Sequence, residues 1–309
     1  MTQKILTGFI LLLILFPLGS CFSQKKNVNN ASFSETISRG ETLLVEGRKF
    51  ENAVSLIDQG KSTPENGNIY RYDIRGAVIF RKCHFQKSLA LALKNGTGSY
   101  YTTIGQQVFF DSCYFWGDVD FRGLVVRGTL NFNNCIFNGN ANFEELECSS
   151  NAWFLHCFFK KEVRFQNAFF NRKANFFANT FDSICSFQSA FFNQEAQFSN
   201  TKFWKYTDYS LCVFNAGSFF NYTTFYDRAI FNNTQFRDRV EFLGATFKAA
   251  AEMRSCKFWE AAKFDQVKLI EMLDLSDSRF MAGKPRLPSS VNGTVITKDV
   301  NYAGQESLQ

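Results

Sequence analysis

Large apolar residues recur along most of this chain at alternating steps of five and six residues. From Phe110 to Phe280 the pattern fills 32 consecutive positions, and 26 of them hold phenylalanine. As a rule, a small or aliphatic residue lies two positions before each of them. Such regularity predicts a structure that repeats one short unit many times.

The spacing favours strands over helices. An 11-residue period also fits a right-handed coiled coil. In a helix, however, a step of five at about 100° per residue places alternate phenylalanines on different faces. In a strand, residues i−2 and i point the same way, so each unit offers one small and one large inward side chain. A face this short must stack on the face one turn earlier, which predicts a β-solenoid.

The coil length follows from residues that repeat every 22 positions rather than every 11. The cysteine series is interrupted by leucines at the intermediate positions, and the asparagine series by Asp182 and Trp204. The two series are Cys113, Cys135 and Cys157, and Asn171, Asn193 and Asn215. We therefore expect one coil to contain 22 residues, the spacing from Cys113 to Cys135.

The stretches FNGNANFEELEC and FNQEAQFSNTKF resemble the pentapeptide-repeat family in its Phe-centred variant with 11-residue double units. The resemblance covers residues 110–280 and an earlier set at Ile74, Phe80 and Phe85. It implies an all-β fold, a right-handed quadrilateral parallel β-helix. In this fold the large apolar position (the large slot) and the small residue two positions before it (the small slot) both face inward. Four slots per coil give eight coils, a rod of about 35–40 Å at about 4.8 Å per coil.

The flanking segments depart from the repeat. We expect the β-helix to span residues 69–282, with a hairpin insertion at 86–105 around an Asn95-Gly96 turn. Residues 21–68 form a partly helical N-terminal segment and candidate cap, because Phe50, Ala53, Val54 and Ile57 share one helical stripe within 48–59. Residues 283–309 are expected to be a polar tail.

Residues 1–20 are typical of a signal peptide. Lys4 precedes an apolar run at 5–16, which is too short to cross a bilayer as a helix. Leu18-Gly19-Ser20-Cys21 resembles a lipobox and predicts lipidation of Cys21; ordinary cleavage before Gln24 is the alternative. We expect an exported, membrane-anchored lipoprotein rather than a soluble periplasmic or secreted protein. Loss of Lys4 leaves 33 basic and 28 acidic residues, a net charge of +5.

Residues of known catalytic or metal-binding types are sparse. The sequence contains no nucleotide-binding loop, nucleophile elbow or C-x-x-C pair, and its two histidines, His84 and His156, fall in outward positions. Seven cysteines occupy small inward slots and Cys148 a large one, which predicts buried thiols rather than disulfides. We predict no catalytic residue, no metal and no cofactor.

These features favour a non-enzymatic scaffold or binding module of the bacterial cell envelope. The alternative is a polysaccharide-active β-helix enzyme, whose charged groups would be Asp120, Arg122, Glu144 and Arg164. The resemblance also implies DNA mimicry, because some pentapeptide-repeat proteins bind gyrase in this way. That role needs an acidic rod, whereas this chain is basic, so we expect no nucleic-acid partner.

One outward column is unusually apolar. The residues just before the large slots on one face are Val125, Glu147, Phe169, Phe191, Val213 and Gln235. We take Val125, Phe169, Phe191 and Val213 as a candidate interaction stripe for another envelope protein or for self-association. The alternative is that the N-terminal segment or the 86–105 hairpin covers it. Glycan stacking on Trp116, Trp204 or Trp259 is a separate hypothesis.

Overall fold

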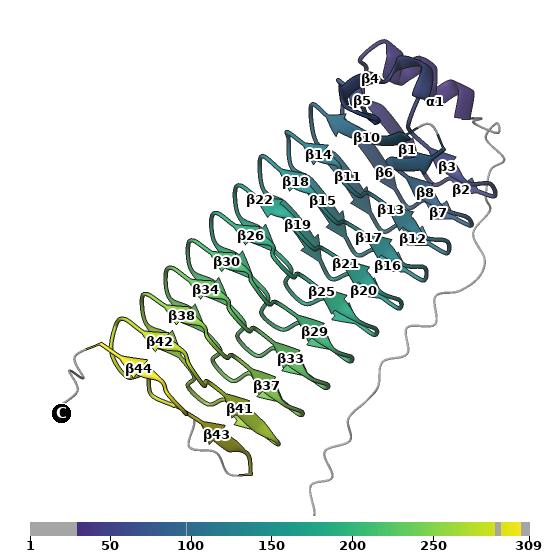
Figure 1. Cartoon of the computed structure of the whole chain (residues 1–309). Coiled ribbons are helices and arrows are strands. Elements are labelled where there is room, and N and C mark those ends of the chain that lie inside the picture. Colours follow the sequence, from purple (N-terminus) through teal and green to yellow (C-terminus); the bar gives the residue numbers. More distant parts are fainter. Residues whose placement is uncertain (1–29, 97, 288–291, 304–309) are drawn as a thin grey trace, which may run out of the picture.

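The computed structural model describes residues 30–96, 98–287 and 292–303. The chain winds into four-sided coils that stack as a rod, with helix α1 (Asn30–Ser38) at the N-terminal end (Figure 1). Strands of successive coils form four sheets of ten, ten, eleven and thirteen strands, here called sheets A, B, C and D. The predicted four-sided parallel β-helix with a short N-terminal helix is confirmed.

The strands of sheets A and B follow one another along the rod. Sheet A contains β1 (Leu43–Glu46), β6 (Val78–Arg81), β11 (Val108–Asp111), β15 (Leu130–Asn133), β19 (Ala152–Leu155), β23 (Ala174–Asn175), β27 (Ala196–Gln197), β31 (Ser218–Phe219), β35 (Val240–Glu241) and β39 (Ala262–Lys263). Sheet B contains β2 (Lys49–Phe50), β7 (His84–Phe85), β12 (Tyr114–Phe115), β16 (Ile136–Phe137), β20 (Phe158–Phe159), β24 (Thr180–Phe181), β28 (Lys202–Phe203), β32 (Thr224–Phe225), β36 (Thr246–Phe247) and β40 (Lys268–Leu269).

Sheets C and D complete each coil. Sheet C contains β3 (Val54–Ser55), β8 (Leu89–Ala90), β13 (Val119–Asp120), β17 (Ala141–Asn142), β21 (Val163–Arg164), β25 (Cys185–Ser186), β29 (Thr207–Asp208), β33 (Ala229–Ile230), β37 (Ala251–Glu252), β41 (Met272–Asp274) and β43 (Thr294–Ile296). Sheet D contains β4 (Thr63–Asn66), β5 (Ile69–Ile74), β9 (Ala92–Asn95), β10 (Gly98–Ile104), β14 (Val125–Val126), β18 (Glu147–Cys148), β22 (Phe169–Phe170), β26 (Phe191–Phe192), β30 (Val213–Phe214), β34 (Gln235–Phe236), β38 (Lys257–Phe258), β42 (Arg279–Phe280) and β44 (Asn301–Tyr302).

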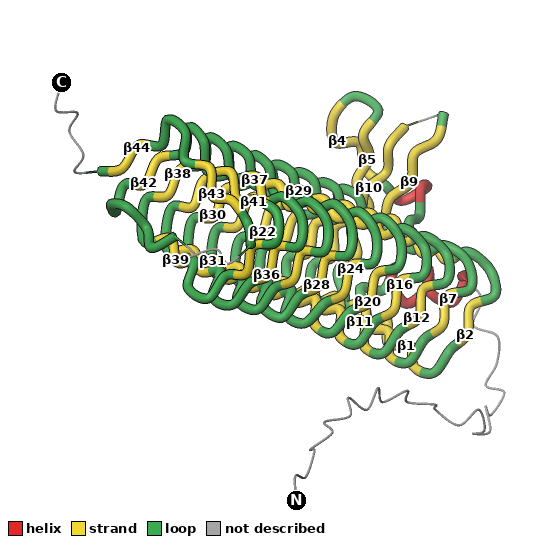
Figure 2. The backbone as a smooth tube through the Cα atoms, turned by 90° about the horizontal axis from the view of Figure 1, so that it is seen from below, coloured by secondary structure: helices red, strands yellow, loops and turns green. Residues whose placement is uncertain are grey.

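The register confirms the predicted coil length. Val108 pairs with Leu130 in sheet A, and Tyr114 pairs with Ile136 in sheet B. The same spacing holds in sheets C and D, and every one of these pairings is parallel. Figure 2 shows the coils stacked in line along the rod. Each large slot therefore lies directly over the equivalent slot of the next coil.

All 32 large slots point into the rod and are at most 3% exposed. In sheet A, the ring of Phe198 lies 4.9 Å from those of Phe176 and Phe220, with interplanar angles of 2° and 3°. Its neighbour across the core, Phe187, meets it edge to face at 5.3 Å and 83°. Both arrangements suit the quadrupole of an aromatic ring. Phenylalanine is favoured because one side chain can stack along the rod and present its edge across it.

The small inward slots also satisfy the backbone. The hydroxyl of Thr223 donates to the carbonyl of Phe198 at 2.8 Å, and that of Thr201 donates to the carbonyl of Phe176 at 2.7 Å. Cys256 does the same through sulfur, 2.9 Å from the carbonyl of Phe231. Each donor follows its acceptor by the same sequence offset, so it caps a corner carbonyl of the coil before. This explains why threonine and cysteine share a slot with alanine.

The corners need a left-handed backbone at regular intervals. A positive φ recurs once in every repeat unit from Ser112 to Asp277, and glycine fills this position only at Gly123 and Gly244. Asparagine, which tolerates this region, occurs several times, but the bulky Leu211 and Tyr222 adopt it as well, at φ 60° and 57°. The stacked coils impose the conformation at these two sites.

The prediction of a helix within residues 48–59 was wrong. This stretch contains β2 and β3 of the first coil, and the ring of Phe50 stacks on Phe85 at 4.9 Å. The three- and four-residue spacing of its apolar residues also fits two short strands that meet at a corner. The β-helix accordingly begins at Leu43 rather than 69, and the helix of the N-terminal segment is α1, whose Phe33 packs on Phe50 and Phe80.

The hairpin prediction for 86–105 needs a narrower boundary. Leu89–Ala90 stays in sheet C, and only β9 and β10 form the antiparallel pair. A second hairpin, β4 and β5, was not predicted. Together the two hairpins form the N-terminal end of sheet D, which stands off the rod in Figure 2. Arg71 ties this projecting end to the coils by donating to the carbonyl of Gly123 at 2.9 Å.

The segment 283–309 is more than a polar tail. Strand β43 pairs with β41 in sheet C, and β44 pairs with β42 in sheet D. The ring of Tyr302 continues the aromatic column, 5.5 Å from Phe280. Leu287, which lies between β42 and β43 in the sequence, packs against the core. The C-terminal segment thus covers the last coil.

Truncation in the middle of the sheet A column should destabilise the rod strongly. We expect Phe198→Ala to lower the free energy of unfolding by about 3–5 kcal/mol, because it leaves a cavity among stacked rings. Chemical denaturation measures the loss, and Lys202→Ala on the outside of β28 is the control. Asn193→Ala is unsuitable as a control, since the Asn193 amide donates to Asn171 at 3.1 Å. Equal losses for Phe198→Ala and Lys202→Ala would contradict the inward assignment.

Removing one buried hydroxyl should stabilise the protein. Tyr209 replaces phenylalanine in the sheet C column, is fully buried, and its hydroxyl has no hydrogen-bond partner among the described residues. Burial also raises the pKa of Tyr209 well above its ordinary value. We expect Tyr209→Phe to raise the free energy of unfolding by about 1–3 kcal/mol, the cost of an unsatisfied polar group. Tyr222→Phe, at an exposed corner, should change little; a destabilised Tyr209→Phe variant would show that the hydroxyl has a partner.

Candidate functional site

The predicted interaction stripe is one straight column on the outside of sheet D. Val125, Glu147, Phe169, Phe191 and Val213 are consecutive ladder partners on β14, β18, β22, β26 and β30. The rings of Phe169 and Phe191 are stacked at 5.3 Å and 12°. Phe169 is 38% exposed, and Val125, Phe191 and Val213 are half-buried. Glu147 separates Val125 from the other three, so the contiguous apolar part is Phe169, Phe191 and Val213.

The described neighbouring segments do not cover this apolar part. Helix α1 packs on the first coils, and on the side that faces the stripe the hairpin of β9 and β10 pairs only with β14, through Thr103–Val125 and Ile104–Val126. Figure 1 places both elements at the N-terminal end of the rod. Phe169 and Phe191 lie two and three coils further on, with their rings at the surface.

The charged groups of sheet C come together as ion pairs. Arg122 contacts Asp120 at 2.8 Å, and Arg164 contacts Glu162 at 2.7 Å and Glu144 at 3.9 Å. The hydrogen bond to Glu162 raises the pKa of Arg164. Asp120, Glu162 and Arg164 border a depression of about 230 Å³. Three carboxylates share two guanidinium groups, an arrangement typical of a surface ion-pair ladder rather than of an acid–base pair.

The histidines and cysteines are not brought together into a metal site. His84 stacks on Tyr114 at 4.7 Å, and burial followed by the nearby Lys49 lowers its pKa. His156 is at a corner, edge-on to Phe177. Cysteines in the described residues are all buried and unbridged. Across those same residues, no three His, Cys, Asp or Glu side chains are grouped to hold a metal ion.

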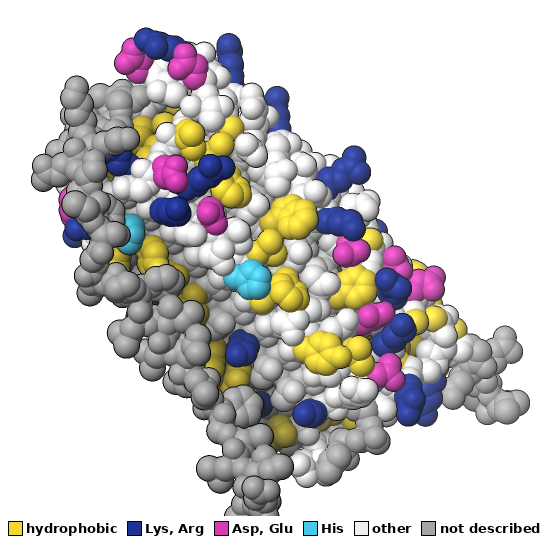
Figure 3. Space-filling view, turned by 180° about the vertical axis from the view of Figure 1, so that it is seen from behind, with side chains coloured by type: hydrophobic (Ala, Val, Ile, Leu, Met, Phe, Trp, Pro, Cys, Tyr) yellow, Lys and Arg dark blue, Asp and Glu magenta, His cyan; other side chains and the backbone are white. Residues whose placement is uncertain are grey.

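A second apolar surface was not predicted from the sequence. The corner between sheets A and B carries Trp153, Leu155, Phe158 and Phe177, all half-buried. Figure 3 shows apolar side chains gathered between charged ones on the side of the rod that carries the two histidines. These residues belong to several outward columns, so no single column of the sequence pattern is apolar enough to predict the surface.

Two of the three candidate tryptophans have partners that limit their availability for sugar stacking, whereas Trp116 is 53% exposed. Trp204 stacks on Tyr226 with their ring centroids 3.9 Å apart, and the ammonium of Lys248 lies 4.2 Å from the ring of Tyr226. The guanidinium of Arg237 lies 6.0 Å from the ring of Trp259. One face of each of these tryptophans is thus directed at a neighbour within the rod.

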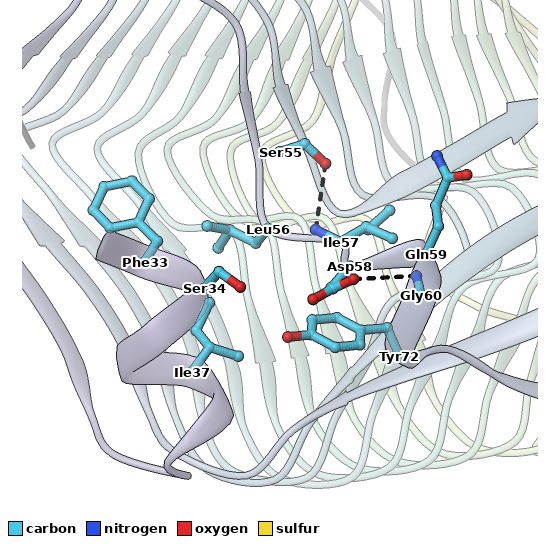
Figure 4. A pocket seen from close by; sticks show the side chains of 10 residues that line it. All are labelled: Phe33, Ser34, Ile37, Ser55, Leu56, Ile57, Asp58, Gln59, Gly60 and Tyr72. Carbon is cyan, nitrogen blue, oxygen red and sulfur yellow. Dashed lines mark hydrogen bonds between the residues drawn. The ribbon is translucent and has the colours of Figure 1, made fainter. Parts of the chain in front are cut away.

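A cavity of about 500 Å³ opens at the N-terminal end (Figure 4). Phe33 and Ile37 of α1 line one side, and the corner after β3 and Tyr72 of β5 line the other. The cavity depends on the helix and on hairpin β4–β5, which interrupt the repeat. The sequence pattern does not predict the cavity, because its lining residues lie outside the regular repeat and their positions do not follow from its spacing.

Comparison with known proteins gives no assignment. No protein-family model, curated protein or solved structure matches the chain. Cys21 and the predicted leader lie outside the described residues. Within the described ranges, no helix is long and apolar enough to span a membrane.

Proposed function

We propose that this protein is an exported scaffold or binding module of the bacterial cell envelope, built on a pentapeptide-repeat β-helix and held at a membrane by lipid on Cys21. The leader and lipobox support export and anchoring. The carrying observation is the stacking of the exposed Phe169 on the half-buried Phe191 at the surface of sheet D. The stripe binds another envelope protein or a second copy of the chain, without a cofactor or nucleic acid.

The stripe is suited to binding because the fold holds it in place. Phe170 and Phe192, the next residues along the same strands, are fully buried in the core. Their inward packing fixes the backbone behind the two exposed rings, so little conformational freedom is lost when a partner binds. Aromatic side chains of this kind carry much of the affinity at protein interfaces.

The polysaccharide-active alternative has weaker support. Asp120, Glu144 and Glu162 are all paired with arginines. Hydrolysis needs one carboxyl group that donates a proton and another that stays ionised. The environments of these three carboxyl groups are too similar for one to act as the proton donor while another stays ionised.

Phe191→Asp tests the interaction stripe. We expect an unchanged melting temperature, and loss of a partner or of a larger assembly by at least about tenfold in affinity, typical of a central aromatic contact. Pull-down from envelope fractions and sizing chromatography measure the two kinds of complex. Thr246→Asp on sheet B is the control. A lower melting temperature would instead mean that the stripe is covered, and an unchanged variant in all three measurements would remove the site.

Cys21→Ala tests the anchor. The parent protein should partition into the detergent phase of a membrane extract, whereas the variant should appear in the aqueous phase because it lacks the acyl chains. Mass spectrometry of the N-terminal peptide identifies the lipid. Recovery of both proteins in the aqueous phase, with Gln24 at the N-terminus, would replace the anchored form with a soluble exported one.

A further inference from the structure

The end cavity combines an apolar floor with a few polar groups. Phe33, Ile37 and Leu56 are almost fully buried and form the floor. Its volume of about 500 Å³ lies within the range of small-molecule sites, and those sites share this mixture. Tyr72 on β5 lies four strands along sheet D from Phe169 on β22, so the role of the cavity is independent of the proposed function.

Tyr72 presents to the cavity a hydroxyl that the protein itself does not use. The residue is 4% exposed, and its hydroxyl points into the cavity in Figure 4. No group in the described part of the chain forms a hydrogen bond with it, so it is free to bond to a ligand in the cavity. Burial and then the charge of Asp58 raise the pKa of Tyr72, so the hydroxyl is neutral at ordinary pH.

Asp58 lies beside this hydroxyl and supplies the negative charge. One carboxylate oxygen accepts a hydrogen bond from the backbone N–H of Gly60 at 3.1 Å. Its other oxygen is 3.3 Å from the ammonium of Lys61, which also donates to the hydroxyl of Ser38 at 2.9 Å. Lys61 is half exposed at the rim and is not among the residues that line the cavity.

The lining is therefore rich in acceptors and lacks a basic side chain among its described residues. It offers the carboxylate of Asp58, the oxygen of Tyr72 and the hydroxyl of Ser34. The ammonium of Lys61, 3.3 Å from Asp58, shows that a cation suits this carboxylate. A ligand that brings its own donors and positive charge would complete the bonding of Tyr72, whereas an anion would be repelled by the carboxylate of Asp58, whose charge is offset only from the rim by Lys61.

We propose that this cavity binds a small primary amine with an apolar body. The ammonium group donates to Asp58 and Tyr72, and the apolar body lies against Phe33, Ile37 and Leu56. Lys61 competes for Asp58 from the rim and sets the affinity.

Three probes of one shape test the charge preference: 2-phenylethylammonium, 2-phenylethanol and 3-phenylpropanoate. Isothermal titration of the full chain at neutral pH should give binding of the ammonium at least about tenfold tighter than of the alcohol, because a charged hydrogen bond is the stronger one. The carboxylate should bind most weakly. Equal affinity for all three probes, or no binding of the ammonium, would overturn the proposal.

Variants locate the binding. Asp58→Asn keeps an acceptor for Gly60 and should reduce the ammonium affinity to that of the alcohol, whereas Lys61→Met should raise it several-fold. Glu51→Gln makes the same charge change at an exposed ion pair with Lys49 and should have no effect. Tyr72→Phe retains the packing and should weaken ammonium binding several-fold, which keeps the test valid if Asp58→Asn destabilises this end. Equal effects of Glu51→Gln and Asp58→Asn, or no effect of Tyr72→Phe, would show that the amine binds elsewhere.

Discussion

The parallel ladder between successive coils is the interaction on which the rest of this structure depends. A coil can pair with the one before it only if both have the same length and corners, because one extra residue turns inward side chains outward. From Val108 onward the register keeps one constant offset, that between Val108 and Leu130, through every sheet. The ring columns, the corner conformations and the donors to corner carbonyls all follow this repeat. They are consequences of a single constraint.

Periodicity is why so much of the fold was readable from sequence. A large residue at alternating steps of five and six can be buried in every case only if each unit turns one corner of a four-sided coil, and all 32 such positions are buried. The outward column of Phe169 and Phe191 followed from the same register. Nothing in that register marks a left-handed corner at Leu211 or Tyr222, since those conformations are imposed by the neighbouring coils.

Prediction was poorest where coils differ in length. Leu43 pairs with Val78 and Val78 with Val108, and both offsets are longer than the one from Val108 to Leu130. The additional residues form the two hairpins. Without a fixed interval, the apolar residues of 48–59 matched a helix as well as two strands. Tertiary pairing decides between them, and the pairing partner of Phe50 is Phe85, which lies beyond the first hairpin.

Sites on such a rod can arise in two ways. Inward positions are committed to the core, and corner positions to a fixed backbone, so within the regular coils only the outward columns are free to carry recognition. A column repeats at the ladder spacing, which suits extended contacts such as the stacked Phe169 and Phe191. A cavity of this size needs residues that leave the repeat. In this chain it lies where α1 and the hairpin of β4 and β5 do so, and there the hydroxyl of Tyr72 opens into the cavity without a partner in the described structure. An unused polar group is costly in a core but useful at a binding site, since a ligand can recover the lost hydrogen bond.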